Sequence, residues 1–189
     1  MKKIIVLLFL AVTGCVMILS AQTKKDIKKN KVKSVRVTST FSKDGKNITI
    51  DESFERYDGS GNLIEEITYD ADGSQKNRTT NVYNKNNDKT EEVLYTPDGK
   101  VKKKKQTKYN STGDKIEELH YDGSGVLVDR DVSTYNANGD RTTEVTMDPK
   151  NNVLKKVIYL YDNHGMKVSR KTYDSKSVLE SEKKYVYEY

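Results

Sequence analysis

Apolar and aromatic residues recur along this chain at short, regular intervals, separated by clusters of Asp, Asn, Gly and Ser. The segments between clusters are eight or ten residues long, as in NLIEEITY and VLVDRDVSTY. They are rich in Thr, Val, Ile and Tyr and contain no proline, which is typical of β-strands. Connections this short join antiparallel neighbours and not parallel ones. The pattern therefore predicts an all-β fold, a continuous antiparallel meander of about twelve strands.

The aromatic positions that precede the turns form an internal repeat. A shorter and a longer interval alternate along the chain, as in Tyr57 to Tyr69 and then Tyr69 to Tyr83. The period is therefore roughly 26 residues and contains two strands, which indicates one supersecondary unit stacked along the chain. Phe41, which begins FSKDG, extends the series upstream after a still longer interval. The other anchors are Tyr57, Tyr69, Tyr83, Tyr95, Tyr109, Tyr121, Tyr135, Met147, Tyr161, Tyr173 and Tyr187.

The turn sequences, such as YDGSG, YDADG and YNANG, explain how the strands are connected. Asp, Asn, Ser or Thr follows the anchor in each of them, where the side chain can bond the turn backbone. Pro97 and Pro149 both fall at the second turn position, which requires the negative φ that the proline ring fixes. The last position is Gly or Asn, the residues that best tolerate positive φ. Ser177 is the exception, so we expect its turn to be the weakest.

The numbering of the tyrosines predicts how they are arranged on the sheet. All thirteen have odd numbers, and side chains alternate between faces along a strand. We therefore expect every tyrosine to share one face. Both faces mix apolar and charged residues, which favours a single-layer or coiled sheet over a sandwich with a buried core. Cross-strand pairs worth roughly 0.2–1 kcal/mol each would then supply much of the stability.

The composition is consistent with such a sheet and argues against a nucleic-acid partner. Charged residues make up 33% of the chain, and it has thirteen tyrosines, three phenylalanines and no tryptophan. Disorder is the competing interpretation at this polarity, but the regular spacing of Tyr and β-branched residues argues against it. The net charge of +6 includes Lys2 and Lys3 and is too mild to require a nucleic acid. We expect no nucleic-acid partner.

Residues 1–21 have the plan of a secretory signal peptide. Lys2 and Lys3 precede an apolar stretch, and Ala21 supplies a small residue at the expected cleavage site. An alternative stays open, since the residues before Cys15 resemble a bacterial lipobox and Cys15 would then be lipidated. Membrane attachment is expected only in that case. Either way we expect an exported protein that is periplasmic, surface-exposed or secreted, with a polar linker at 22–30 and a β-repeat domain at 31–189.

A family resemblance follows from these repeats. YDGSGNLIEEITYD, YDADG and YDGSGVL resemble the YD repeats of RHS-like bacterial surface and toxin-delivery proteins, over about residues 41–187. The resemblance implies antiparallel strands that spiral into a shell in the large members of that family. This chain is far shorter than those shells. The charged strands are also similar in composition to the free-standing sheet of spirochaete outer-surface lipoproteins.

The candidate chemistry is sparse, and we expect no catalytic residues, no metal site and no cofactor. Asp70 and Asp72 resemble the start of a calcium loop, but the further ligands and distal glutamate of such a loop are missing. His120 and His164 are far apart in the sequence and are expected to be solvated. The basic run Lys102–Lys105 alternates between faces along a strand, which divides its charge between them.

The best candidate for binding is a ladder of tyrosines that recurs on every second strand at one end of the sheet, Tyr57, Tyr83, Tyr109, Tyr135 and Tyr161. A structural role stays open, in which each ring packs on its neighbours and its hydroxyl bonds the backbone. We expect a non-enzymatic protein that presents an extended surface to a glycan, polymer or protein at the bacterial cell envelope. A structural spacer and a calcium-dependent enzyme are the alternatives, and the oligomeric state is left undetermined.

Overall fold

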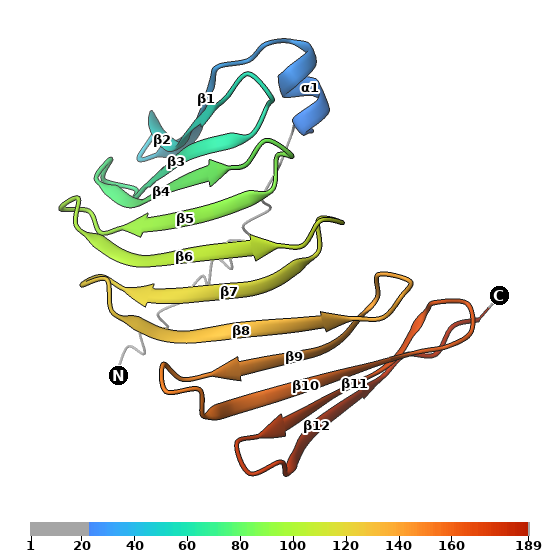
Figure 1. Ribbon diagram of the computed structural model, residues 1–189. Helices are drawn as coiled ribbons and strands as arrows, with labels where there is room; N and C mark the ends of the chain where they lie inside the picture. The colour runs from blue at the N-terminus through green and yellow to red at the C-terminus, as the bar shows by residue number, and fades with distance from the viewer. Residues whose placement is uncertain (1–22, 189) are drawn as a thin grey trace, which may run out of the picture.

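The computed structural model describes residues 23–188, and over this range twelve strands follow one another in chain order in a single antiparallel sheet (Figure 1). This confirms the predicted all-β meander. The predicted signal peptide and Cys15 lie outside the described residues. The elements are α1 (Lys24–Lys29), β1 (Ser34–Lys43), β2 (Lys46–Tyr57), β3 (Leu63–Tyr69), β4 (Gln75–Tyr83), β5 (Lys89–Tyr95), β6 (Val101–Tyr109), β7 (Lys115–Asp122), β8 (Leu127–Tyr135), β9 (Arg141–Met147), β10 (Val153–Tyr161), β11 (Lys167–Asp174) and β12 (Leu179–Lys184).

The sheet is a single layer, and its strand direction rotates from β1 to β12 (Figure 1). The buried apolar side chains among residues 23–188 are Ile27, Val93, Val157 and Tyr159, too few for a continuous core. Other apolar side chains face solvent, such as Val82, which is 53% exposed. Lateral contacts between neighbouring strands must therefore replace the layer-to-layer packing of an ordinary domain. Within the described range, none of the helical structure has the length and apolar character of a membrane span.

The turns from Tyr57 onward share one backbone design. In each, the amide after the anchor donates to a carbonyl four residues later, as in Asp58 N to Asn62 O at 2.9 Å. The amide at the last turn position donates back across the loop, as in Gly61 N to Asp58 O at 3.0 Å. That last position has positive φ in every case, including Asn87 at 66° and Ser177 at 63°. The predicted requirement for a left-handed residue is confirmed.

The first turn differs from the predicted series. Phe41 was expected to open a turn, but it lies inside β1 and pairs with Ile48 on β2. The turn itself is formed by Asp44 and Gly45, both with positive φ, at 51° and 74°. Two consecutive left-handed residues are the signature of a type I′ hairpin turn, which Asp-Gly favours. The longer interval between Phe41 and Tyr57 therefore marks a change of turn type.

Each later hairpin contains a β-bulge, and the bulges overturn the prediction that all tyrosines share a face. Tyr57 pairs with Leu63, but the next pair is Arg56 with Glu65, so Ile64 is an extra residue on β3. Beyond the bulge, even-numbered residues of one strand face odd-numbered residues of the next. Since the shift recurs at every hairpin, odd-numbered side chains change face from strand to strand.

The tyrosines are consequently divided between two faces. We call face A the side of the sheet that carries Arg78 and Thr80 of β4 and Tyr95 of β5. Arg78 pairs with Tyr95, and its guanidinium lies 4.8 Å from the centre of the Tyr95 ring. Face B is the opposite side and carries Tyr83, Tyr109, Tyr135 and Tyr161. The prediction that all tyrosines share a face was wrong because it took each bulged turn to pair residues of equal parity, and the strand after each turn contains a further extra residue, such as Ile64.

A short helix occupies the segment that was expected to be a polar linker. Thr23 caps α1, accepting a hydrogen bond from the Asp26 amide at 3.3 Å, and Asp26 reaches back to the Thr23 backbone in a capping box. Ile27 is 2% exposed, although it stands among lysines. A Cβ added to Gly61 would lie 2.8 Å from the Lys24 carbonyl oxygen, so α1 rests directly on the turn between β2 and β3.

Replacing Ser177 by glycine should stabilise the protein by about 0.5 kcal/mol. The left-handed conformation costs a serine on the order of 1 kcal/mol, and the greater freedom of glycine in the unfolded chain offsets part of the gain. Urea denaturation measures the difference. Ser175→Gly in the same turn is the control, since Ser175 has no positive φ and the change should not stabilise. Equal effects of the two substitutions would contradict the prediction.

Gly61→Ala should destabilise the protein by at least about 1 kcal/mol more than Gly73→Ala. Both residues have positive φ, so both variants incur the same backbone strain. Only at Gly61 does the new methyl group meet α1, while the space around Gly73 is open. Thermal or urea unfolding of the pair isolates the contact with the helix. Similar losses of stability at both sites would show that α1 does not dock on this turn.

Candidate binding surface

The predicted aromatic ladder lies on one face and at one end of the sheet. Tyr57, Tyr83, Tyr109, Tyr135 and Tyr161 each stand at the end of an even-numbered strand, before the turn into the next strand. They are on face B and are partly exposed. Successive members are two strands apart, which corresponds to about 10 Å. The periodicity therefore placed these five residues together correctly, although it did not separate them from the tyrosines of face A.

The hydroxyl groups of the ladder link neighbouring turns at this end of the sheet. Each one after Tyr57 donates to a backbone carbonyl 20 residues earlier in the chain, at the start of the preceding odd-numbered strand. Tyr57 instead bonds the Glu55 carboxylate. Burial raises the pKa of the Tyr83, Tyr109 and Tyr161 hydroxyls, so they remain donors. The bonds are Tyr83 to Leu63 at 3.0 Å, Tyr109 to Lys89 at 2.9 Å, Tyr135 to Lys115 at 2.7 Å and Tyr161 to Arg141 at 2.9 Å.

A cation and a glutamate accompany the central tyrosines of the ladder. Tyr109 pairs across its turn with Lys115, whose ammonium lies 2.9 Å from a Glu118 carboxylate oxygen. The same arrangement occurs one period earlier and one period later, and we call the whole set the tyrosine–cation–glutamate row. Its three complete units are Tyr83–Lys89–Glu92, Tyr109–Lys115–Glu118 and Tyr135–Arg141–Glu144.

The charged members of this row were not among the residues predicted from the sequence. The signal was present, since the cation follows the tyrosine by six residues and the glutamate by nine in each unit. A regular strand would not bring residues three apart onto the same face. The extra residue that follows each turn does so, and the predicted pairing did not include it. At the fourth unit Tyr161 pairs with Lys167, whose ammonium lies 4.9 Å from the centre of the Tyr159 ring.

Face A also carries acidic residues, but they are closely paired with neighbouring strands. The Glu65 carboxylate accepts from Arg78 at 2.7 Å and lies 3.2 Å from Arg56. Lys108 lies 2.6 Å from Glu117 in the equivalent position two units later. These contacts neutralise the acids and contribute to strand pairing, as expected for cross-strand charge pairs.

The basic run Lys102–Lys105 divides its charge as predicted. The Lys104 ammonium lies 5.0 Å from the centre of the Tyr121 ring on face A. Lys105 lies 3.8 Å from Glu92, a member of the row on face B. The run therefore does not form one continuous cationic patch.

The acidic turns use their oxygens for backbone hydrogen bonds. The Asp58 carboxylate accepts from the amides of Ser60 at 2.8 Å and Asn62 at 2.9 Å, and these bonds lower its pKa even though burial raises it. In the turn that resembled a calcium loop, Asp72 accepts from the Ser74 amide and Asp70 lies 3.3 Å from the Lys76 ammonium. These contacts are those of an ordinary turn.

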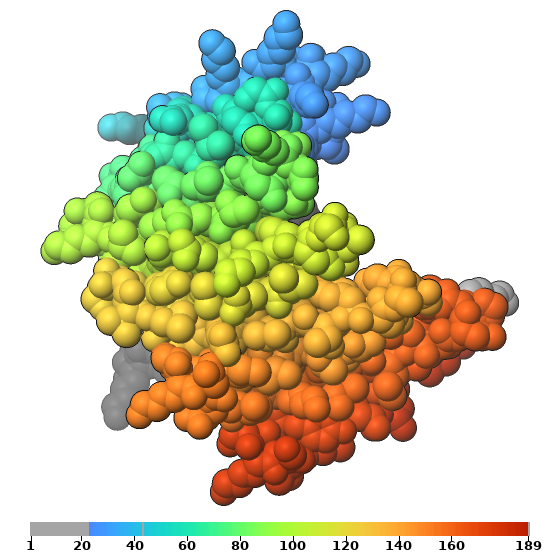
Figure 2. Space-filling view, viewed as in Figure 1, coloured from blue at the N-terminus to red at the C-terminus, as the bar shows by residue number. Residues whose placement is uncertain are grey.

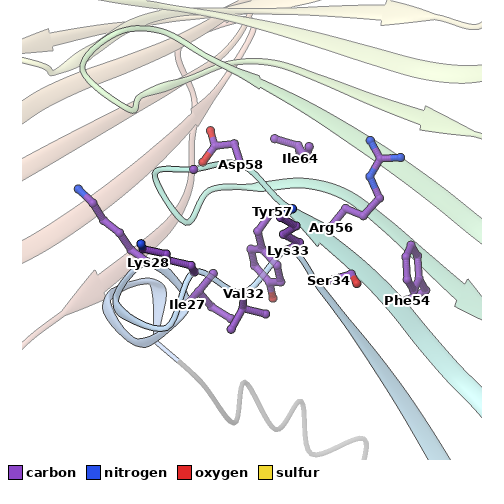
Figure 3. A pocket seen from close by; sticks show the side chains of 12 residues that line it. Ile27, Lys28, Val32, Lys33, Ser34, Phe54, Arg56, Tyr57, Asp58 and Ile64 are labelled. Atoms are coloured by element: carbon purple, nitrogen blue, oxygen red, sulfur yellow. The ribbon is translucent and has the colours of Figure 1, made fainter.

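A hollow of about 630 Å³ lies between α1 and the first strands (Figure 3). Ile27, Val32 and Phe54 contribute apolar surface, while Lys28 and Arg56 carry charge at the same site. This lining would suit an apolar group with an anionic end. The hollow was not predicted because residues 22–30 were expected to be a linker; the capping box at Thr23 and Asp26 was the available signal.

Comparison with known proteins finds no matching family model and no matching curated protein. Among solved structures, a porin-like protein from Bacteroides uniformis is 12% identical, with a TM-score of 0.47 over 74% of this chain and 70% of that one. A Photorhabdus luminescens Tc holotoxin pore is 15% identical, with a TM-score of 0.41 over 76% of this chain and 9% of that one. A DUF1329 family protein from Desulfovibrio piger is 11% identical, with a TM-score of 0.23 over 82% of this chain and 84% of that one.

All three TM-scores are below 0.5, so these similarities do not identify a shared fold or function. No family model supports the YD-repeat resemblance, which stays a prediction based on the turn sequences.

Tyr135→Phe should destabilise the protein by about 1 kcal/mol, because it removes the 2.7 Å hydrogen bond to the Lys115 carbonyl and keeps the ring. Tyr95→Phe on face A is the matched control, since its hydroxyl makes only a 3.5 Å contact with Thr80. Urea unfolding of both variants measures the difference. A loss at Tyr135 no larger than at Tyr95 would refute a stabilising link between neighbouring turns.

Proposed function

We propose that this chain is an exported, non-enzymatic β-repeat protein whose tyrosine–cation–glutamate row binds an extended glycan at the bacterial cell envelope. The observation that carries the proposal is the regular recurrence of the row on face B of a single-layer sheet. Figure 2 shows the strands stacked in chain order as successive bands of side chains across the visible surface. A polymer with its own regular repeat is the ligand class that matches such a periodic surface.

The chemistry of the row supports a carbohydrate ligand. A tyrosine ring offers an apolar face on which the C–H surface of a sugar can stack. Lysine, arginine and glutamate supply charge-assisted hydrogen bonds to hydroxyl groups or to acidic sugars. Units about 10 Å apart would contact successive segments of one extended chain. Each contact can be weak, because several contacts on one polymer act together.

The structural role of the hydroxyls favours this function and does not compete with it. The backbone bonds use the hydroxyl at the edge of each ring, and the tyrosines are partly exposed as whole residues. A side chain held in its position before binding loses less entropy when the ligand arrives. The bonds that link the turns therefore also preorganise the ladder.

Export is supported by the pattern of residues 1–21, with its basic start, apolar middle and small residue at the expected cleavage site. An envelope protein meets long polysaccharides at high local concentration, which suits a surface of many weak contacts.

A structural spacer is the second candidate, and the hydrogen bonds between neighbouring turns favour it. A tyrosine that serves only to link Lys115 to β8 would need no accessible ring. Under this alternative the sheet separates other envelope components and has no glycan ligand. Binding measurements separate the two candidates.

Purified protein should bind at least one bacterial envelope polysaccharide in a panel examined by affinity electrophoresis and biolayer interferometry. Tyr109→Ala and Tyr135→Ala should weaken binding about tenfold or more, since stacking contacts are lost. Tyr135→Phe should retain most of the binding because it keeps the ring. Circular dichroism of each variant verifies that the sheet is intact.

Tyr95→Ala and Tyr121→Ala are the matched controls. They remove the same residue type near strand ends, but on face A, and should leave binding unchanged. Absence of binding to every polysaccharide by the wild-type protein would refute the proposal and favour the spacer. An equal loss from both sets of variants would show that face B is not the binding surface.

A further inference from the structure

The internal repeat provides five aligned copies of one set of positions from β3 to β12 on face B. A glutamate recurs at the first position of four of them, with Arg170 in the fifth, and one of these four differs from the other three. The copy on β7 and β8 combines it with His120, Asp129 and Asp131. The equivalent positions read Glu66, Thr68, Asn77 and Thr79; Glu92, Leu94, Lys103 and Lys105; and Glu144, Thr146, Lys155 and Val157. The fold therefore accounts for the recurring glutamate but does not require the histidine or either aspartate.

These residues converge around the His120 ring. Its Nε2 lies 2.9 Å from a Glu118 carboxylate oxygen and 4.0 Å from Asp131 Oδ2. Its Nδ1 lies 2.5 Å from Asp129. One ligand atom each from Glu118, His120 and Asp131 lies within 4.8 Å of the others. The histidine predicted to be solvated is in fact 26% exposed in its side chain and surrounded by three carboxylates.

The surroundings fix the carboxylates and leave one oxygen of each directed at Nε2. Lys115 lies 2.9 Å from Glu118 Oε2, so Oε1 is the oxygen that faces the ring. Thr146 donates to Asp131 Oδ1 at 2.6 Å, and among residues 23–188 Asp131 accepts a side-chain hydrogen bond at that oxygen alone. A single N–H at Nε2 cannot satisfy both carboxylates. A cation with several coordination positions can.

We infer that Glu118, His120 and Asp131 form a binding site for a divalent transition-metal ion of the zinc class. Imidazole and carboxylate are ordinary zinc ligands, with metal–ligand distances of about 2.1 Å. In a tetrahedral site the ligand atoms lie about 3.4 Å apart, so the contacts of 2.9 Å and 4.0 Å need adjustments of only about half an ångström. Calcium is disfavoured because it takes oxygen ligands.

Asp129 completes the site as a positioning residue. A metal-bound histidine usually donates its other N–H to a carboxylate, which fixes the ring and its tautomer. Asp129 occupies that position at Nδ1. Three protein ligands leave the fourth position open, as in zinc sites that bind water or an external ligand.

Two lysines lie near the cluster. Lys105 pairs directly across the strands with His120, and its ammonium lies 3.8 Å from Glu92. Lys115 contacts the far oxygen of Glu118.

Protonation of His120 is the alternative explanation for the geometry of the cluster. Burial alone would lower the pKa of the ring, but Glu118, Asp129 and Asp131 raise it. An ion pair of imidazolium with the carboxylates would then explain the geometry without any metal. Direct measurement of metal binding distinguishes the two.

Isothermal titration calorimetry of the metal-free full-length protein with Zn²⁺ should give one saturable equivalent. Bound Co²⁺ should produce visible d–d absorption of tetrahedral type. His120→Leu and Asp131→Asn should each weaken Zn²⁺ binding at least about tenfold, and Asp129→Asn should weaken it about 10–100-fold. Leucine is chosen because Leu94 occupies the equivalent position one repeat earlier, so the sheet already accommodates it.

His164→Leu and Asp51→Asn are the matched controls. His164 lies in an exposed turn and Asp51 on β2, so both should leave Zn²⁺ affinity unchanged. The inference is overturned if the wild-type protein binds no stoichiometric Zn²⁺, or if His120→Leu binds it as tightly. The test uses the metal alone, so its result is independent of glycan binding.

Discussion

The bulged turn is the constraint on which the rest of this structure depends. Each turn from Tyr57 onward needs a left-handed residue at its end and adds one residue to the strand that follows. The added residue shifts the register, so side chains three apart, such as Lys115 and Glu118, meet on the same face. It also moves alternate tyrosines to opposite faces. The composition of both surfaces therefore follows from a feature of the backbone at the turns.

A single layer must obtain its stability from neighbours along the sheet. Surface ion pairs contribute about 0–1 kcal/mol each, and a tyrosine hydroxyl bond to a carbonyl about 1 kcal/mol. The bond from Tyr135 to Lys115 joins the directly paired strands β7 and β8 at the end of the sheet where each strand turns into its other neighbour. Stability then accumulates through nearest-neighbour contacts, as in other repeat proteins. Polar strands suffice because no strand has to be buried on both faces.

Much of the fold could be predicted from the sequence because turn chemistry is local. The left-handed position favours glycine or asparagine, and the second turn position favours proline. Each preference depends only on the φ of that one residue. The face of each side chain was predicted wrongly because one bulge residue reverses it, and no individual residue marks the bulge. The ladder of Tyr83 to Tyr161 was still predicted to lie on one face, because successive members are two bulges apart and two reversals restore the original face. The convergence of His120 with Glu118 and Asp131 could not be predicted, since it depends on the shifted register between β7 and β8.

The repeat also separates two kinds of chemistry on face B. Features that recur, such as the tyrosine with its cation and glutamate, serve the sheet and present a periodic surface. His120, Asp129 and Asp131 do not recur, and three other units fold without them. Glu118 belongs to both sets, because it contacts Lys115 within the row and His120 within the cluster. A metal ion held at β7 and β8 would therefore lie beside the middle of the row. Its open coordination position could take a hydroxyl or carboxylate of the same polymer, which would add one strong, oriented contact to a series of weak ones.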